Sequence, residues 1–226
     1  MYLSKVTPTI HAIHRLKRQF SGNLFWEHQM VWDLFDNTTE QTRDFLYRRE
    51  DSPGKLPFYY VLSERQPNNA GLDMEIQSKA FHPRLQAGER LQFSLRANAV
   101  ITRKVDDHSN KRQRRDIIEA RVDEYKKQYP NPQDRPPPSI IHQEAAQMWL
   151  NRQGENNGFS VGEFFVENHT FHKVRKPKDA NTRQFTSLDF QGQLIVNAPD
   201  QFLRAMKNGL GRSKAFGCGL MLVKRI

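Results

Sequence analysis

The first hundred residues alternate between two hydrophobic periods, one typical of helices and one typical of strands. Leu24, His28, Val31, Trp32 and Phe35 recur on one helical face, which predicts a helix, and the pattern over 42–49 predicts that this helix extends or repeats. Short alternating segments predict strands at 2–6, 58–63, 74–80 and 90–97. The predicted order is therefore close to a β-α-β-β-α-β unit whose second helix is reduced to a loop.

A second unit of the same kind is predicted after a polar break. Residues 101–138 are basic and rich in proline, which predicts an inserted or mobile region. Beyond this region Ser139 is expected to cap a helix over 140–152, and a further helix is expected near 200–207. Strands are predicted at 159–166, 170–175, 185–196 and 219–224. The fold class is therefore α+β, with one unit in 1–100 and another in 139–226.

Composition indicates a folded protein with an anionic partner. The chain has 226 residues, 37% hydrophobic residues, 15 Phe and a formal net charge of +10. Aromatic residues argue against disorder, and the excess of bases favours an acidic ligand such as nucleic acid. The single cysteine, Cys218, is typical of a reducing compartment. With no apolar run long enough to span a bilayer and no signal-peptide pattern, we expect a cytoplasmic protein.

The positive charge is concentrated at two places in the chain. Residues 1–22 carry four bases and no acid, and residues 171–226 carry eleven bases against three acids. Residues 23–76 carry five bases against ten acids and are therefore acidic. A solvated face is the simple explanation of a charge run, but no acid follows Asp200 to neutralise the last bases locally.

The glycine-rich run at 209–219 favours contact with phosphates. It lacks the spacing of a phosphate-binding Walker loop, but glycine permits close approach to another backbone, and the run also carries bases. A helix C-cap followed by a tight turn is the alternative explanation. The candidate residues are Gly209, Gly211, Gly217 and Gly219, with Arg212, Ser213 and Lys214 between them.

A basic segment at 172–183 lies between two predicted strands and predicts a hairpin that contacts RNA. A solvated hairpin tip is the alternative. The candidate RNA-binding residues here are Lys173, Arg175, Lys176 and Lys178, and the basic N-terminal segment adds Arg15 and Arg18.

The histidines do not favour a metal site. His169 and His172 would point to opposite faces of a strand, and His11 and His14 have no third ligand nearby. His28 is different, because a half-buried imidazole near a helix start can exchange protons near neutral pH. By periodicity alone, a histidine packed in the core is the better explanation of His28.

Four segments together resemble the CasE (Cse3) family of CRISPR RNA endoribonucleases, of the RAMP superfamily and the type I-E Cascade. They are MYLSKV, LFWEHQMVWDLF, FHPRLQAGERLQFSLRAN and GLGRSKAFGCGLMLV, spread over the whole chain. The resemblance implies two tandem ferredoxin-like (RAMP- or RRM-like) domains with mostly antiparallel sheets. It also implies a precursor CRISPR RNA repeat hairpin as substrate, retention on the mature crRNA, and other Cascade subunits as partners, without a membrane or direct DNA binding.

The same resemblance implies metal-independent cleavage at the stem base, with no cofactor. The 2′-hydroxyl attacks the adjacent phosphate, leaving a 5′-hydroxyl and a 2′,3′-cyclic phosphate, and His28 acts as general acid or base. The family carries a tyrosine three residues before this histidine, where this chain has Phe25. Tyr2, Lys17 or Ser21 is expected to substitute, unless His28 acts with cations alone.

Two other functions fit the sequence. The absence of the tyrosine is compatible with a non-catalytic RNA-binding subunit of a CRISPR surveillance complex. A basic scaffold for protein contacts would bind RNA without sequence preference and lose that binding with salt.

Overall fold

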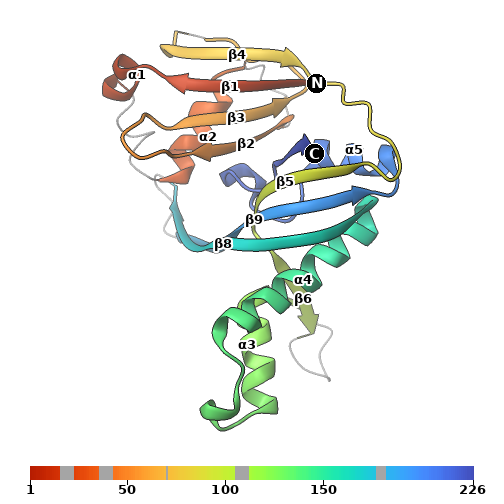
Figure 1. The fold of residues 1–226 in the computed structure, drawn as a ribbon. Coiled ribbons are helices and arrows are strands. Elements are labelled where there is room, and N and C mark those ends of the chain that lie inside the picture. Colours follow the sequence, from red (N-terminus) through yellow and green to blue (C-terminus); the bar gives the residue numbers. More distant parts are fainter. Residues whose placement is uncertain (16–22, 36–42, 70, 105–111, 177–181) are drawn as a thin grey trace.

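The computed structural model describes residues 1–15, 23–35, 43–69, 71–104, 112–176 and 182–226, without the side chain of Arg15. Within these ranges the chain forms two four-stranded antiparallel sheets and one two-stranded ribbon. Figure 1 shows the two sheets one above the other, with a helical hairpin extending away from the lower sheet. The α+β class with mostly antiparallel sheets is therefore confirmed.

The first sheet has the strand order β2-β3-β1-β4. Its strands are β1 (Tyr2–Pro8), β2 (Phe45–Glu50), β3 (Phe58–Ser63) and β4 (Met74–Ala80). Helices α1 (Ile10–Arg15) and α2 (Leu24–Trp32) cover one face, where Ala12, Met30 and Val31 pack on Phe45 and Tyr47. This is the ferredoxin-like strand order, with a loop in place of the second helix, as the sequence predicts.

The second sheet has the order β10-β5-β9-β8. Its strands are β5 (Arg90–Ala97), β8 (Phe159–Arg175), β9 (Thr182–Val196) and β10 (Met221–Arg225). Helices α4 (Pro138–Asn157) and α5 (Pro199–Asn208) pack on one face through Trp149, Leu150 and Phe202. The chain order β5-α4-β8-β9-α5-β10 completes a second ferredoxin-like unit, so the two-unit architecture is confirmed.

Two predictions about the first unit are wrong. One strand is missed and one strand of the other sheet is wrongly included, so the predicted number of strands still matches the observed four. Residues 42–49 do not extend the helix: strand β2 begins at Phe45, with Phe45 and Tyr47 facing α2 and Leu46 buried on the opposite side. A strand buried on both faces loses its alternation, which explains the error. Residues 90–97, assigned to the first unit, form β5 and pair with β9 and β10 in the second sheet.

Of the two alternatives for 101–138, an inserted or a mobile region, the described part of the segment supports the insertion. It forms β6 (Val100–Lys104), β7 (Arg112–Asp116), α3 (Ile117–Gln128) and a short 3-10 turn, η1 (Pro132–Asp134). Ile117 and Ile118 are buried in the core of the second unit. The segment is therefore an ordered insertion between β5 and α4, which follow each other directly in the ferredoxin-like order.

Two boundaries also differ from the predictions. Helix α4 begins at Pro138, and its N-cap is Pro137 without a side-chain cap, so Ser139 lies inside the first turn. Proline at the first helical position is already in the required conformation, which makes a serine cap unnecessary. The strands predicted at 159–166 and 170–175 are one strand, β8, with two irregularities in its pairing with β9.

The two units face each other through the helix-free sides of their sheets. Leu46 and Leu62 of the first sheet form a buried cluster with Leu220 of the second unit. The Arg48 guanidinium donates to Ser94 Oγ at 2.8 Å, and Arg96 donates to the Arg49 carbonyl at 3.1 Å. In the described residues no helix is long and apolar enough to cross a membrane.

Candidate active site

His28 lies in a ring of aromatic side chains that come from both units. Asn23 starts α2 by accepting a hydrogen bond from Phe25 N at 3.1 Å, which fixes the first turn. One turn later the His28 ring lies 5.9 Å from Phe45 and 6.4 Å from Tyr47 of β2. Phe216, almost two hundred residues later in the chain, lies 6.4 Å away and edge-on. The aromatic ring therefore depends on both units being in place.

The His28 imidazole is kept neutral by its surroundings. Burial, together with the positive charges of Arg43 and Lys176, lowers its pKa to about 4. Its Nδ1 is buried and has no hydrogen-bond partner among the described residues. An imidazole with this pKa is unprotonated at neutral pH and is able to accept a proton.

Cations from three separate parts of the chain are linked through Arg43. Arg43 and Lys176 act on His28, and Arg43 also acts on Lys214. Arg43 precedes β2, Lys176 follows β8, and Lys214 belongs to the glycine-rich run. Burial and the charges of Arg43 and Arg212 lower the pKa of Lys214. Like charges at such close quarters favour a bound anion, because it relieves their repulsion.

The glycine-rich run is held in a fixed conformation that places Phe216 against His28. Gly209, Gly211, Gly217 and Gly219 all have positive φ, and a Cβ on Gly211 would lie 2.9 Å from the Asn98 carbonyl oxygen. Arg212 N donates to that oxygen at 3.1 Å, and Asn98 Nδ2 contacts Ser213 Oγ at 2.6 Å. Tyr47 Oη donates to the Ala215 carbonyl at 3.2 Å. Gly209 also caps α5, as the helix-cap explanation of the run requires.

The β8–β9 hairpin reaches from the second sheet to the start of α2. Its strands pair as far as Arg175 opposite Thr182, as predicted for a hairpin at 172–183. Asn23 Nδ2 donates to the Arg175 carbonyl at 3.1 Å, and Figure 1 shows this end of β8 rising toward α2. The contact brings the base of the hairpin to the helix that carries His28. Lys178 lies outside the described residues.

The remaining predicted residues have different outcomes. Tyr2 of β1 is opposite Ser63 of β3, and Ser63 is opposite Phe45 of β2. Tyr2 therefore lies on the same sheet face as Phe45, which neighbours His28, but the backbones of the two residues are two strands apart, about 10 Å. Lys17, Arg18 and Ser21 lie outside the described residues, as does the side chain of Arg15. Phe25, at the position of the family tyrosine, packs edge-on against Trp26 at 5.1 Å.

Sequence reasoning missed Arg43, Tyr47 and Phe216. Arg43 is isolated in the sequence, and nothing local indicates that it approaches a helix. Tyr47 falls in the segment that was expected to be helical. Phe216 carried a usable signal, because a large aromatic residue inside a glycine-rich run is unusual for a simple turn.

Comparisons with known proteins match residues 1–225 to the family described as CRISPR associated protein. The CRISPR system Cascade subunit CasE of Escherichia coli (strain K12) is 28% identical over 227 residues, which cover 98% of each chain. The CRISPR-associated endoribonuclease Cse3 of Thermus thermophilus is 26% identical over 239 residues, covering 99% of each chain. A solved structure of CRISPR endoribonuclease Cse3 bound to a 19-nucleotide RNA is 26% identical, with a TM-score of 0.72 over 99% of this chain and 100% of that chain. This chain therefore belongs to the CRISPR-associated CasE (Cse3) family.

Proposed function

We propose that this chain is a metal-independent endoribonuclease that cleaves the repeat hairpin of precursor CRISPR RNA at the base of its stem. The observation that carries the proposal is a neutral, half-buried His28 surrounded by cations from both units. Relatives named as an endoribonuclease and as a Cascade subunit, each matching nearly the whole chain, support the substrate class.

In the proposed reaction the RNA supplies the nucleophile. His28 accepts the proton of the 2′-hydroxyl, whose oxygen forms a bond to the adjacent phosphorus. The bond from phosphorus to the 5′-oxygen breaks, which leaves a 2′,3′-cyclic phosphate on one strand and a 5′-hydroxyl on the other. Arg43 and Lys176 stabilise the negative charge that develops on the phosphorane.

The departing 5′-oxygen needs a proton, and Lys214 is the donor we assign among the described residues. Its lowered pKa makes it a readier donor than an ordinary lysine, and Arg43 acts on both Lys214 and His28. Tyr47 is less suitable, because its hydroxyl already donates to the Ala215 carbonyl. Lys17 and Tyr2 stay candidates from the sequence for the place of the missing tyrosine.

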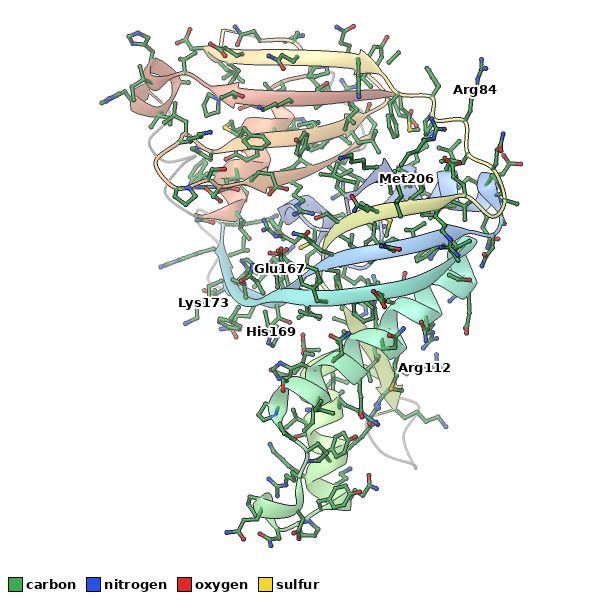
Figure 2. All side chains as sticks on the ribbon, viewed as in Figure 1. Arg84, Arg112, Glu167, His169, Lys173 and Met206 are labelled. Carbon is green, nitrogen blue, oxygen red and sulfur yellow. The ribbon has the colours of Figure 1, made fainter. Side chains whose placement is uncertain are left out.

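The stem is proposed to lie along the β8–β9 hairpin, with its base at His28. Lys173 and Arg175 are exposed on β8, so both are free to meet phosphates of the stem. Figure 2 shows Lys173 and His169 on the part of β8 beyond the centre of the second sheet. After cleavage the protein is proposed to stay on the mature crRNA as a Cascade subunit.

The test is single-turnover cleavage of the repeat hairpin RNA of the organism that encodes this chain, with EDTA present. Wild type should give the cyclic phosphate and 5′-hydroxyl ends, and His28→Ala should bind the hairpin but lose about 100-fold or more in rate. His82→Ala, in the exposed 81–89 loop, is the matched control and should cleave normally. Full activity of His28→Ala would overturn the assignment.

A non-catalytic RNA-binding subunit is the second candidate, favoured by Phe25 at the tyrosine position. Tight hairpin binding without product after long incubation would establish it. We expect cleavage instead, and we expect Phe25→Tyr to accelerate it several-fold, because a hydroxyl would be added near His28.

A further inference from the structure

A basic groove outside the aromatic ring of His28 is not used by the proposed reaction. It has a volume of about 700 Å³ and lies between the β6–β7 ribbon and the β8–β9 hairpin, closed at one end by the glycine-rich run. We call it the ribbon groove and define it by Arg114, Arg183 and Arg212 with Phe171, Phe185 and Phe216. The inserted segment therefore builds one wall of a cavity that the two ferredoxin-like units alone would lack.

A buried carboxylate fixes the two walls of the ribbon groove to each other. Asp116 ends β7 and caps α3, accepting hydrogen bonds from Ile118 N at 2.8 Å and Glu119 N at 3.1 Å. Its second oxygen accepts a hydrogen bond from the Thr186 hydroxyl of β9. Since the carboxylate is buried and fully occupied, it shapes the groove without presenting an acid to a ligand.

The charge that faces the groove is positive and available. Arg114, Arg183 and Arg212 are exposed, and none of them has an ion pair within the described part of the chain. Arg115 also lines the groove, but its guanidinium pairs with Asp123 at 2.6 Å. Glu119 is the exposed acid at the rim. Three unpaired guanidinium groups on three walls suit a chain of phosphates.

Aromatic rings line the same groove. Phe171 of β8 is 56% exposed, which is unusual for a phenylalanine and leaves its ring accessible for stacking. Phe185 of β9 stacks on Phe216 at 5.8 Å. Cations that follow a backbone, together with rings that stack on bases, are the combination that binds single-stranded nucleic acid without base readout.

The ribbon groove is continuous with the candidate active site through Phe216. One edge of this ring faces His28 at 6.4 Å, and its face stacks on Phe185 inside the groove. An RNA strand that passes His28 therefore meets the mouth of the groove next. Double-stranded RNA exposes few base faces, whereas an unpaired strand presents them for stacking.

From this geometry we infer that the ribbon groove binds the single-stranded RNA that adjoins the base of the stem. The inference rests on the proposed function, because it takes the stem base to lie at His28. The groove positions the unpaired strand leaving the scissile phosphate: the arginines hold its backbone, and the exposed Phe171 stacks on a base. Phe185 lies between His172 and Phe216 and supports the wall of the groove. An RNA with an unpaired flank is thereby bound more tightly than the bare hairpin.

The experiment compares three probes of the repeat hairpin: no flank, a 5′ single-stranded flank and a 3′ single-stranded flank. Each carries a 2′-deoxynucleotide at the stem base, so that no cleavage occurs during the binding measurement. For wild type, one flanked probe should bind about tenfold tighter than the bare hairpin, and scrambling the flank should preserve the gain. If neither flank tightens binding while the bare hairpin binds, the inference fails and the proposed function stands.

The variants are Arg114→Gln with Arg183→Gln, and separately Phe171→Ala. Each should remove most of the flank's tenfold gain while leaving the affinity for the bare hairpin within about twofold. The double arginine variant should also lower the salt slope of the flanked probe by about 1.4, since each lost single-strand phosphate contact removes about 0.7. Arg84→Gln is the control for the loss of an exposed arginine elsewhere, because Arg84 lies at the opposite side of the molecule from Lys173 in Figure 2.

Two outcomes with the variants would also overturn the inference. Equal losses for the bare and the flanked hairpin would mean that these arginines hold the stem. An unchanged flank gain in both variants would mean that the flank binds elsewhere. If wild type fails to bind even the bare hairpin, the proposed function itself is rejected, which is a separate result. Thermal unfolding of each variant checks that the fold is retained.

Discussion

His28 has an environment that suits accepting a proton better than donating one. The pKa is lowered to about 4 by burial and by two cations, whereas an acid that works at neutral pH needs a pKa near 7. A phosphate bound beside Arg43 and Lys176 would offset their charge and move the pKa of His28 upward again. The direction of this change makes proton acceptance easier once RNA is bound.

The pH dependence of cleavage follows from the lowered pKa of His28. The value of kcat/KM reports the free enzyme, in which His28 is neutral above its pKa, so the rate should be flat from about pH 5 to 8 and fall as pH drops through about 4. Single-turnover cleavage with saturating enzyme should show its acid limb at a higher pH, because bound phosphate raises the pKa of His28. A rate that instead rises as pH falls from 7 to 5 would assign His28 as the acid.

At the residue level, the sequence could indicate His28 but not its partners. A histidine on an apolar helical face is visible in the pattern, and the family resemblance selects it. The lowered pKa is a tertiary property, because it depends on Arg43 and Lys176, which lie on other segments. Ser213, an RNA-binding candidate from the sequence, has a structural contact that the sequence does not indicate: its hydroxyl accepts a hydrogen bond from Asn98 Nδ2, which holds the loop.

At the level of elements, the glycine-rich run matters because its backbone fits between β2 and the end of β5. Gly219 N donates to the Arg96 carbonyl at 2.7 Å, and Leu210 N donates to the Gly219 carbonyl at 3.0 Å. These bonds close the run on itself and tie it to β5. The 3-10 turn η2 (Lys214–Phe216) is thereby held as a rigid platform for Lys214 and Phe216.

Alanine substitutions at two glycines separate backbone conformation from close packing. Gly211 and Gly88 have similar φ, +77° and +83°, but a Cβ meets the Asn98 carbonyl only at Gly211. Gly88→Ala should cost about 1–2 kcal/mol for the left-handed conformation alone. Gly211→Ala should cost at least about 1 kcal/mol more and slow cleavage as Phe216 shifts. Urea unfolding measures the cost of each substitution, and single-turnover cleavage measures the rate of each variant. Equal costs for the two variants and an unchanged cleavage rate for Gly211→Ala would contradict the role of η2 as a platform.

The sequence predicted elements well where one face is exposed and poorly where both are buried. Strand β5 alternates buried and exposed positions and was predicted with its observed bounds. Strand β2 is buried on both faces over Phe45–Arg48 and was taken for helix. The partner of a strand is also invisible locally, which is why β5 was placed in the wrong sheet.

For the whole molecule, the candidate site exists only where the two units meet. His28, Phe45 and Arg43 come from the first unit, and Lys176, Lys214 and Phe216 come from the second. Cations from both units thus act at His28, and the buried carboxylates of Glu27 and Asp189 nearby are paired with Arg49 and Arg96. Arg43 comes from the acidic 23–76 segment and Lys176 from the basic 171–226 segment, so their approach to His28 depends on the packing of one sheet against the other.

The leucine cluster between the sheets should therefore control RNA binding at a distance. Leu62 of β3 is buried against Leu46 and Leu220, whereas Leu150 of α4 is buried wholly within the second core. Leu→Ala at either position should cost about 2–5 kcal/mol of the free energy of unfolding. Only Leu62→Ala should also weaken hairpin binding, because it alters how α2 faces the glycine-rich run.

Urea unfolding measures the cost of each substitution, and binding of the non-cleavable hairpin is measured at low temperature, where both variants are folded. We expect Leu62→Ala to lose several-fold in affinity and Leu150→Ala to bind as wild type does. Leu62 touches none of the proposed RNA contacts, so a loss there has to act through the relative placement of the two sheets. Equal affinity of the two variants would mean that each unit holds its half of the site independently, and that the link from Asn23 to Arg175 is sufficient to align them.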